Sequence, residues 1–434
     1  MSSLFTRGIG MPTVLRAEGC WVTDTAGNRY LDGASGALVV NVGHNDSRVT
    51  SAIHRQLDAV SYVHATAFNS EVLEEYASLL AARLPMDDPS VYTVSGGSEA
   101  VETALKAARA YHLANAEPER SVVIGRDLSY HGNTLGALDI SGRHSLRQPY
   151  LPWLGRASRV PGVLEYRCPN PRHPEDCARW HAATLETEVE RIGPERVAAF
   201  VAEPVGGAAS GAAIPPSGYW EAISQVCGKY GILVIADEVM TGFGRTGKWF
   251  ACEHFDLRPD IMTMAKGASS GYWPLGVCAL SANVASALDQ GGFVHGFTFS
   301  HHLVGAAAGR AVIKRLDELR LVERAEERGR LLGDALQSAI GHHPVVGDVR
   351  GLGLLWAVEL VSDRDTRSPF PPSERMADRL TQSARRNGLL VYPSTGCAGE
   401  GEGDLIMVGP PLIVSVDEIE WLAERLATAL EELR

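Results

Sequence analysis

Four apolar runs, each followed by polar or glycine-rich residues, most constrain how this chain can fold. The runs span residues 121–125, 197–202, 231–236 and 261–265. A strand that is apolar throughout is buried on both faces, which is typical of parallel sheets covered by helices. Because helical patterns alternate with these runs, we predict an α/β fold built on a doubly wound, mostly parallel sheet. Ligands bind beyond the carboxyl ends of such strands, so the residues that follow the runs are expected to share one site.

Lys266 directly follows the run 261–265, and the glycine-rich segment 267–271 comes next. Burial of an ammonium group costs free energy, so a lysine at the end of a buried strand points to a function. Once desolvated, its amine loses a proton near neutral pH and can attack a carbonyl group to form a Schiff base. Taken alone, a strand-end lysine whose amine reaches solvent is the commoner arrangement, so the other strand ends decide.

Asp237 follows the run 231–236, and Tyr130 and His131 follow the run 121–125. A lysine, a carboxylate and an aromatic ring fit pyridoxal phosphate, because the lysine holds its aldehyde and the acid keeps its ring nitrogen protonated. Asp237 suits the acidic role, since the ring nitrogen compensates its charge. Val239 points to the same side as Asp237 and can pack on one face of the ring, with Tyr130 stacked on the other.

A candidate phosphate site precedes the helical pattern of residues 99–109, in the segment Ser95-Gly96-Gly97-Ser98. Glycines let the backbone approach an anion closely, and Ser98 offers a hydroxyl group. The first amides of a helix are free donors at the positive end of its dipole. A serine and glycine helix cap without a ligand is the alternative.

These motifs occur, with several others, in the order in which one enzyme family carries them. The set is Tyr30-Leu31-Asp32-Gly33, Gly43-His44, residues 95–100, Tyr130-His131-Gly132, Ala202-Glu203-Pro204, residues 237–247, Lys266-Gly267 and Gly409-Pro410-Pro411-Leu412. In this set the chain resembles the class III aminotransferases of the omega-amine type, which are fold-type I enzymes dependent on pyridoxal 5'-phosphate. The resemblance extends from Gly19 to about Leu430.

The resemblance implies both an architecture and an active site. It implies a large domain with the parallel sheet, a smaller α+β domain, and Lys266 and Asp237 as catalytic residues. The implied cofactor-binding residues are Gly97, Ser98, Tyr130, His131, Glu203, Asp237, Val239, Lys266 and Thr298. Thr298 is expected to bind the phosphate in the neighbouring subunit, which implies a homodimer or a dimer of dimers with shared active sites.

Three segments are expected from the patterns and the resemblance. Residues 1–60 pack with the small domain, residues 61–304 form the large cofactor-binding domain, and residues 305–434 form the small domain. Within the last segment, the patterns predict one long helical stretch, then two strands joined at glycines, then two helices. Their expected bounds are 305–339, 345–360, 373–387 and 415–433.

Composition excludes several classes of partner. The formal net charge is -12 and no lysine-arginine block is present, so nucleic acid and anionic membranes are not expected as partners. No apolar stretch is long enough to span a bilayer, and Met1–Arg7 lacks the core of a signal peptide, so we expect a cytoplasmic protein. The 7 cysteines are thinly spread, which suits a reducing compartment.

Cys168, His173 and Cys177 stand close together in the chain, in a proline-rich segment. Zinc sites typically have more closely paired ligands and a fourth ligand. We therefore interpret the segment as an irregular loop of the large domain and expect no metal site.

The implied reaction is a transamination in two half-reactions. An amine donor displaces Lys266, and the freed lysine moves a proton from the donor carbon to the cofactor. Hydrolysis releases a carbonyl product, and a keto acid, pyruvate or similar, then takes up the amino group. Two alternatives stay open: a class III enzyme of another reaction type, such as an aminomutase, a racemase or a decarboxylating transaminase, and a catalytically idle homologue.

The substrate pocket is where the sequence departs from the family. Tyr392 and Met407 stand where relatives carry an arginine that binds a substrate carboxylate. Leu38 stands where several omega-amine enzymes carry a bulky aromatic residue. We assign these three residues to the substrate pocket and expect it to be more open. Glu203 lacks its usual arginine partner, so it faces either the substrate or another cation.

Two further features bear on the substrate. Arg350 is a candidate replacement for the missing arginines, although its Arg-Gly-Leu-Gly-Leu setting favours a structural role. The acidic, glycine-rich segment 394–404 predicts a solvated loop, with binding of a positively charged diamine as the alternative.

Overall fold

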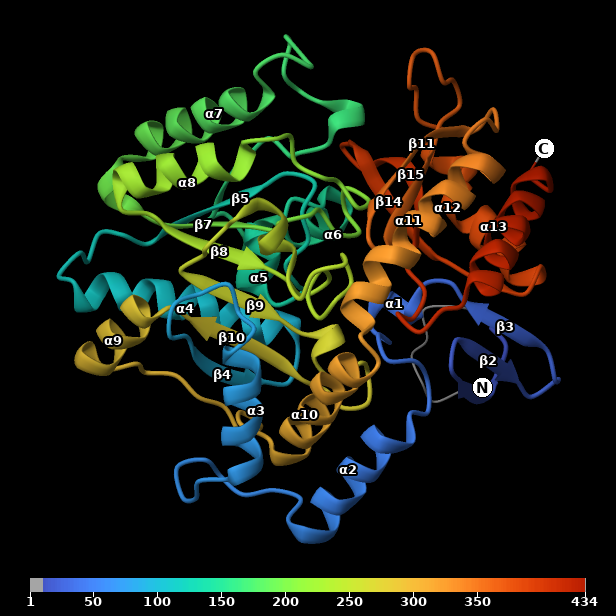
Figure 1. The fold of residues 1–434 in the computed structure, drawn as a ribbon. Helices are drawn as coiled ribbons and strands as arrows, with labels where there is room; N and C mark the ends of the chain where they lie inside the picture. The colour runs from blue at the N-terminus through green and yellow to red at the C-terminus, as the bar shows by residue number, and fades with distance from the viewer. Residues whose placement is uncertain (1–10, 434) are drawn as a thin grey trace.

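A seven-stranded sheet lies at the centre of the computed structural model, which describes residues 11–433 (Figure 1). Its strand order is β4-β10-β9-β8-β7-β5-β6. The strands are β4 (Ser90–Val94), β5 (Val122–Arg126), β6 (Ser158–Val160), β7 (Val197–Ala202), β8 (Leu233–Asp237), β9 (Ile261–Met264) and β10 (Gly276–Leu280). Only β10 pairs antiparallel to its neighbours, so the predicted α/β fold with a mostly parallel sheet is confirmed.

The four apolar runs are the strands β5, β7, β8 and β9, as predicted. Every residue of β7, β8 and β9 is buried. In the parallel register Ala202 lies opposite Ala236, and Asp237 lies opposite Thr263. The carboxyl ends of these strands therefore meet at one edge of the sheet.

Helices cover both faces of this sheet (Figure 1). Phe200 and Ala202 of β7 belong to the core cluster that also contains residues of α7 (Cys177–Ile192) and α8 (Tyr219–Tyr230). Ala199 and Val201 belong instead to the cluster beneath α4 (Gly97–Ala114) and α9 (Ala282–Gly291). Alternate residues of one strand thus pack against opposite helix layers, which explains why the strand is apolar throughout.

Several further helices lie in the region before residue 304. They are α1 (Ser35–Leu38), α2 (Ser47–Ala59), α3 (Glu71–Ala81), α5 (Leu135–Ile140) and α6 (His144–Arg147). None of the helices within residues 11–433 is both long and apolar enough to cross a membrane. The first seven residues, for which no signal peptide is predicted, lie outside the described part of the chain.

A second, antiparallel sheet with the order β11-β12-β15-β14 follows near the C-terminus. Its strands are β11 (Val346–Leu352), β12 (Leu355–Leu360), β14 (Tyr392–Gly399) and β15 (Glu402–Val408). The helices α12 (Met376–Arg386) and α13 (Val416–Glu431) confirm the two predicted C-terminal helices. Ser415 begins α13 with a capping box, in which its side chain accepts from the amide of Glu418.

Two local expectations are wrong. The predicted long helix is two helices, α10 (Leu303–Glu318) and α11 (Leu321–Ile340), because Arg320 between them has a left-handed φ of 50°. The predicted acidic loop 394–404 is largely the β14–β15 hairpin. Its Asp404 is buried and accepts from the amide of Ala377 at 2.9 Å, so this carboxylate caps α12 and is not solvated.

Strands from both ends of the chain form a third sheet with the order β1-β2-β3-β13. They are β1 (Val14–Glu18), β2 (Trp21–Asp24), β3 (Arg29–Asp32) and β13 (Leu389–Leu390), and β13 pairs parallel to β3. The N-terminal segment thus lies against the C-terminal part of the chain. The expected domain boundaries at residues 60 and 304 stay a prediction.

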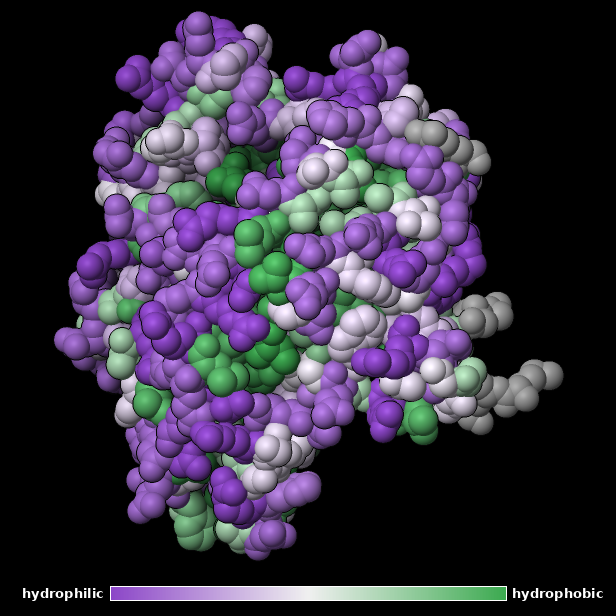
Figure 2. Space-filling model, turned by 45° about the vertical axis from the view of Figure 1, so that its right-hand side comes forward, coloured by the Kyte–Doolittle hydropathy of each residue, from purple (hydrophilic) through white to green (hydrophobic). Residues whose placement is uncertain are grey.

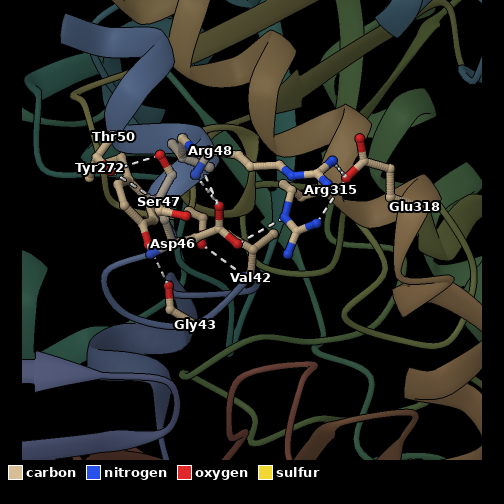
Figure 3. Close-up of polar contacts among 11 residues, drawn as sticks. Val42, Gly43, Asp46, Ser47, Arg48, Thr50, Tyr272, Arg315 and Glu318 are labelled. Carbon is tan, nitrogen blue, oxygen red and sulfur yellow. Dashed lines mark hydrogen bonds and ion pairs between the residues drawn. The ribbon is translucent and has the colours of Figure 1, made fainter.

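Polar contacts fix the N-terminal segment to Tyr272, in the loop that follows Lys266, and to α10 (Figure 3). The hydroxyl of Tyr272 donates to the carbonyl of Gly43 at 2.8 Å and accepts from the amide of Asp46 at 2.5 Å. The carboxylate of Asp46 pairs with Arg315 at 2.8 Å. Both groups of the ion pair are largely buried, so it holds the N-terminal segment against α10.

Candidate active site

A cavity of about 430 Å³ lies at the carboxyl edge of the large sheet. It is lined by the segments that follow β4, β5, β7, β8 and β9. The sequence-predicted residues among its lining are Gly97, Ser98, Tyr130, His131, Glu203, Asp237, Val239 and Lys266. Four strand ends therefore do converge on one cavity, as parallel α/β topology requires.

Lys266 follows β9 and begins a short 3-10 helix, with a left-handed φ of 42°. Burial lowers the pKa of its amine to about 8, and the nearby carboxylates of Asp237 and Glu203 partly oppose this shift. A large share of these amines is neutral near pH 8. The group is therefore placed and tuned to act as a nucleophile and as a proton carrier.

A pH-dependent prediction follows from this pKa. Since only the neutral amine attacks an aldehyde, the rate at which apoenzyme takes up pyridoxal phosphate should rise about tenfold per pH unit below pH 8. The rate should level off above about pH 8, as the pKa of Lys266 lies near that value. Stopped-flow absorbance at a series of pH values measures it. A rate that keeps rising to the ordinary lysine pKa of 10.5 would contradict the lowered pKa.

Asp237 is held by its neighbours so that it lines the cavity. Its Oδ2 lies 2.7 Å from His131 Nδ1, and its Oδ1 accepts from the amide of Val239 at 3.0 Å. His131 is fixed in turn, because its amide donates to the Ser141 hydroxyl at 2.9 Å. Both side chains of this pair are buried. The Asp237 carboxylate can therefore accept a hydrogen bond from His131 and still bind one further cationic partner.

The segment Gly96 to Ser98 leads into α4 and has the features of an anion cradle. Within residues 11–433, no side chain caps this helix, which leaves its first amides free to bind an anion. A Cβ on Gly97 would lie 3.1 Å from Val239 Cγ1, so glycine permits the close approach of the two segments. The Ser98 hydroxyl donates to Asn133 Oδ1 at 3.1 Å and accepts from the Asn133 amide at the same distance.

Gly132 explains why a glycine follows Tyr130 and His131. Its φ is +139°, and a Cβ there would lie 2.5 Å from the Ser98 hydroxyl oxygen. A larger residue would displace Ser98 from the cradle. The Tyr-His-Gly motif and the Ser-Gly-Gly-Ser motif are therefore parts of one packed unit.

Glu203 is a buried carboxylate on the cavity wall. Its Oε1 accepts from the amide of Gly207 at 3.1 Å, whereas its Oε2 has no hydrogen-bond partner among the described residues. Burial raises its pKa, while His131 and Arg126 oppose the shift. A buried, unpaired carboxylate oxygen costs free energy, so it favours a bound group that donates a proton or carries positive charge.

Arg143 is a candidate that sequence reasoning missed. Burial lowers the pKa of its guanidinium, and the hydroxyls of Tyr392 and Tyr130 nearby oppose the shift. Its Nε is buried and without a hydrogen-bond partner in the described chain. No motif singles it out, because it stands far from the strand ends in sequence and comes close to Tyr130 only through the fold.

Four of the predicted residues do not line the cavity. Leu38 and Met407 are buried in a hydrophobic cluster, and Tyr392 packs against that cluster. Their assignment to the substrate pocket stays a prediction. Thr298 is exposed, and its carbonyl accepts from the Tyr62 hydroxyl at 2.8 Å.

Arg350 has the structural role that its setting favoured. Its guanidinium pairs with Asp348 and Glu359, each at 2.8 Å. It also donates to the carbonyls of Ser210 and Gly211. With its donors engaged in this way, Arg350 is not available to a substrate carboxylate.

The model of the family Aminotransferase class-III matches residues 7–430. The chain belongs to this family. It is 40% identical over 413 residues to the uncharacterized aminotransferase YodT of Bacillus subtilis, covering 95% of this chain and 93% of that protein. It is 33% identical over 434 residues to a putrescine–pyruvate aminotransferase of Pseudomonas aeruginosa, covering 98% of this chain and 91% of that protein.

A solved relative has the same fold. An amine transaminase from an uncultivated Pseudomonas species, in its pyridoxal-phosphate-bound form, superposes with a TM-score of 0.92. The two chains are 34% identical, and the match covers 100% of this class III aminotransferase and 98% of that chain. This protein is therefore a transaminase dependent on pyridoxal 5'-phosphate, with amine and keto-acid substrates. The Lys266 amine, the Asp237 carboxylate and the uncapped α4 terminus fit that cofactor.

Proposed function

We propose that this class III aminotransferase transfers an amino group from a cationic amine to a small keto acid such as pyruvate, in two half-reactions of a ping-pong mechanism. The supporting observation is that Lys266, Asp237 and Glu203 share one cavity, with the pKa of Lys266 lowered to about 8. When bound, pyridoxal phosphate supplies an aldehyde that accepts an amino group and a ring that accepts electrons.

Each residue of the cavity takes one role in this proposal. Lys266 Nζ would hold the cofactor covalently and, once free, would act as the base that carries the proton of the donor carbon. Asp237, oriented by His131, balances the positive charge of the ring nitrogen. Val239 and Tyr130 enclose the ring, and the amides of Gly97 and Ser98 bind the phosphate.

The donor class follows from the charges on the cavity wall. Among residues 11–433, no arginine lines the cavity, whereas Glu203 presents an unpaired carboxylate oxygen to it. A donor with its own carboxylate would meet a like charge there, and a donor with a second ammonium group would meet its complement. The relative from Pseudomonas aeruginosa is named for putrescine, a diamine, and for pyruvate, which supports this choice.

A donor panel tests the proposed function. Holoenzyme is incubated with pyruvate and one donor at a time, namely aliphatic diamines, simple alkylamines or omega-amino acids of matched chain length, and alanine formation is measured. We expect diamines to give the highest kcat/KM, and omega-amino acids to be about 10-fold or more poorer, because Glu203 repels their carboxylate. A panel led by omega-amino acids would contradict the assignment of the donor.

The acceptor carboxylate needs a cation, and we propose Arg143 for that role. It is the buried guanidinium next to Tyr130, which lines the cavity, and its Nε lacks a partner in the described chain. A charge-assisted hydrogen bond of this kind contributes about 1.5–3 kcal/mol. Arg143 would thus do the work of the arginines that relatives carry at the positions of Tyr392 and Met407.

Replacing Arg143 should affect the acceptor and not the donor. We expect Arg143→Gln to raise the KM for pyruvate about 10- to 100-fold while the donor half-reaction keeps its rate, as a lost charge-assisted bond predicts. Steady-state kinetics with varied pyruvate, and single-turnover kinetics with the donor alone, separate the two effects. Arg156→Gln, at an exposed arginine, is the matched control. An unchanged KM for pyruvate would remove Arg143 from the site.

We also propose a homodimer in which Thr298 reaches the partner's cavity. Thr298 is exposed, and the apolar side chains of Tyr62, Val294 and Phe299 around it are exposed too. Tyr62 and Phe299 contact each other with ring centroids 6.2 Å apart. Figure 2 shows that hydrophobic surface gathers in a band across one face of the molecule, while its margins are hydrophilic. Exposed apolar side chains that lie together, as those of Tyr62 and Phe299 do, mark protein interfaces.

A further inference from the structure

Cys168, His173 and Cys177 come together in the loop between a short 3-10 helix, Glu165–Arg167, and α7. The two sulfur atoms lie 3.6 Å apart, and His173 Nδ1 lies 3.3 Å from Cys177 Sγ. All three potential ligand atoms lie within 4.8 Å of one another. The loop stands at the upper edge of the molecule in Figure 1, and none of its described residues lines the active-site cavity.

The two separations that involve Cys177 Sγ match the spacing of ligands around a tetrahedral zinc ion. Zn–S bonds of about 2.3 Å and Zn–N bonds of about 2.0 Å place two sulfurs about 3.8 Å apart and a sulfur and a nitrogen about 3.5 Å apart. A disulfide requires about 2.05 Å between the sulfurs. We propose that Cys168, His173 and Cys177 bind one zinc ion, with a water molecule as the fourth ligand.

Asn170 builds the loop around this site. It is buried, and its Nδ2 donates to the carbonyl of Glu175 at 2.7 Å and to Cys177 Sγ at 3.4 Å. Its Oδ1 accepts from the amide of Arg172 at 3.0 Å. Outer hydrogen bonds of this kind orient metal ligands and stabilise a thiolate. The side chain therefore fixes the turn that brings the ligands together before any ion binds.

The two cysteines are also placed to become thiolates on metal binding. Cys177 is the first residue of α7, and its sulfur lies within 3.6 Å of both other ligand atoms. When the ion binds, both thiols release their protons to solvent and the neutral His173 imidazole donates its Nδ1 lone pair.

The site would fasten the loop to its surroundings. Arg167 precedes Cys168, and its Nε pairs with the buried carboxylate of Glu359 on β12 at 2.5 Å. Glu359 also binds Arg350, which holds the carbonyls of Ser210 and Gly211. A metal ion at Cys168 and Cys177 thus links the start of α7 to the C-terminal antiparallel sheet, in a structural role that is separate from the chemistry at Lys266.

Zinc binding by stripped and reloaded holoenzyme tests the proposal. Enzyme is treated with a chelator under a phosphine reductant, reloaded with zinc sulfate, desalted and assayed for metal content. We expect about one zinc ion per chain in the parent, and a loss of at least about 10-fold in Cys168→Ala and Cys177→Ala. Cys278→Ala removes a buried thiol from β10 and serves as the matched control, which should keep the metal.

A second measurement does not depend on the variants folding. Cobalt added to the stripped parent enzyme should give a thiolate-to-cobalt charge-transfer band and the visible bands of a tetrahedral site, seen as a difference spectrum. The proposal is overturned if the parent retains no zinc and gives no such spectrum, or if Cys177→Ala retains zinc like the parent. It is also overturned by two results together. Thiol counting would show a disulfide between Cys168 and Cys177 in enzyme purified without reductant, and reduction of that disulfide would restore no metal binding.

Discussion

Lys266→Ala should abolish transamination, with kcat/KM lowered by about 10⁴-fold or more for every donor. The variant loses both the covalent hold on the cofactor and the amine whose pKa of about 8 allows proton transfer near neutral pH. Cofactor is expected to stay bound without covalent attachment, because the α4 terminus and Asp237 are untouched. Borohydride reduction should attach the cofactor permanently to the peptide that contains Lys266 in the parent enzyme, and to no peptide of the variant. Mass spectrometry of the digested proteins identifies the labelled peptide.

The control for this result is a lysine outside the cavity. Lys314 lies on α10 and does not line the cavity, so Lys314→Ala should keep the parent rate and the parent labelling. Small amines such as methylamine, added to Lys266→Ala, should restore part of the activity by acting as a diffusible base. A Lys266→Ala enzyme that transaminates at the parent rate would refute the proposed role.

Asp237→Asn should lower kcat by about 10²- to 10³-fold, because the amide no longer balances a protonated ring nitrogen in the transition state. The variant keeps the size of the side chain, and its amide can still bond His131, so the fold should be intact. Single-turnover kinetics of the donor half-reaction measure the loss at the step that needs an electron-accepting ring.

A purely structural role for Asp237 gives a different result. If the carboxylate only fixed His131, then His131→Asn would lose as much activity as Asp237→Asn, and the cofactor spectrum would not respond to the loss of charge. We expect His131→Asn to lose less, since it orients Asp237 and carries no charge to the ring. Asp260→Asn, which alters another largely buried aspartate that accepts from the Val234 amide, controls for general destabilisation.

The sequence predicted most strands of the parallel sheet, because a strand that is buried on both faces is apolar at every position. In β7, Phe200 and Ala202 contact one helix layer while Ala199 and Val201 contact the other, so every position must be apolar. Asp237 then stands out as the first charged residue after such a run. The position of a strand end in an α/β fold is thus encoded locally, and the cavity follows from topology.

Features that depend on packing between distant segments were not predictable in this way. The resemblance assigned Leu38 and Met407 to the substrate pocket, and the structure shows both buried in a hydrophobic cluster that forms only in the folded chain. Arg143 reaches Tyr130 and Tyr392 through the fold, and nothing in its sequence neighbourhood marks it.

The loop before α7 shows the same limit at short range. Cys168 and Cys177 are nine residues apart, and their spacing differs from the paired motifs of known zinc sites. Only the turn fixed by Asn170 places their sulfurs 3.6 Å apart. Ligand sets formed by side-chain hydrogen bonds within an irregular loop therefore escape spacing rules.

The most direct test of the central claim is the donor half-reaction alone. Holoenzyme is mixed with a diamine in the absence of any keto acid, and the absorbance of the cofactor and the carbonyl product are measured together. We expect the visible cofactor band to disappear and about one carbonyl product to form per active site. Pyruvate should then restore the band and yield about one alanine per active site. If the band persists with every donor, or product forms without keto acid beyond one turnover, the amino group is never left on the enzyme and the two-step transamination is wrong.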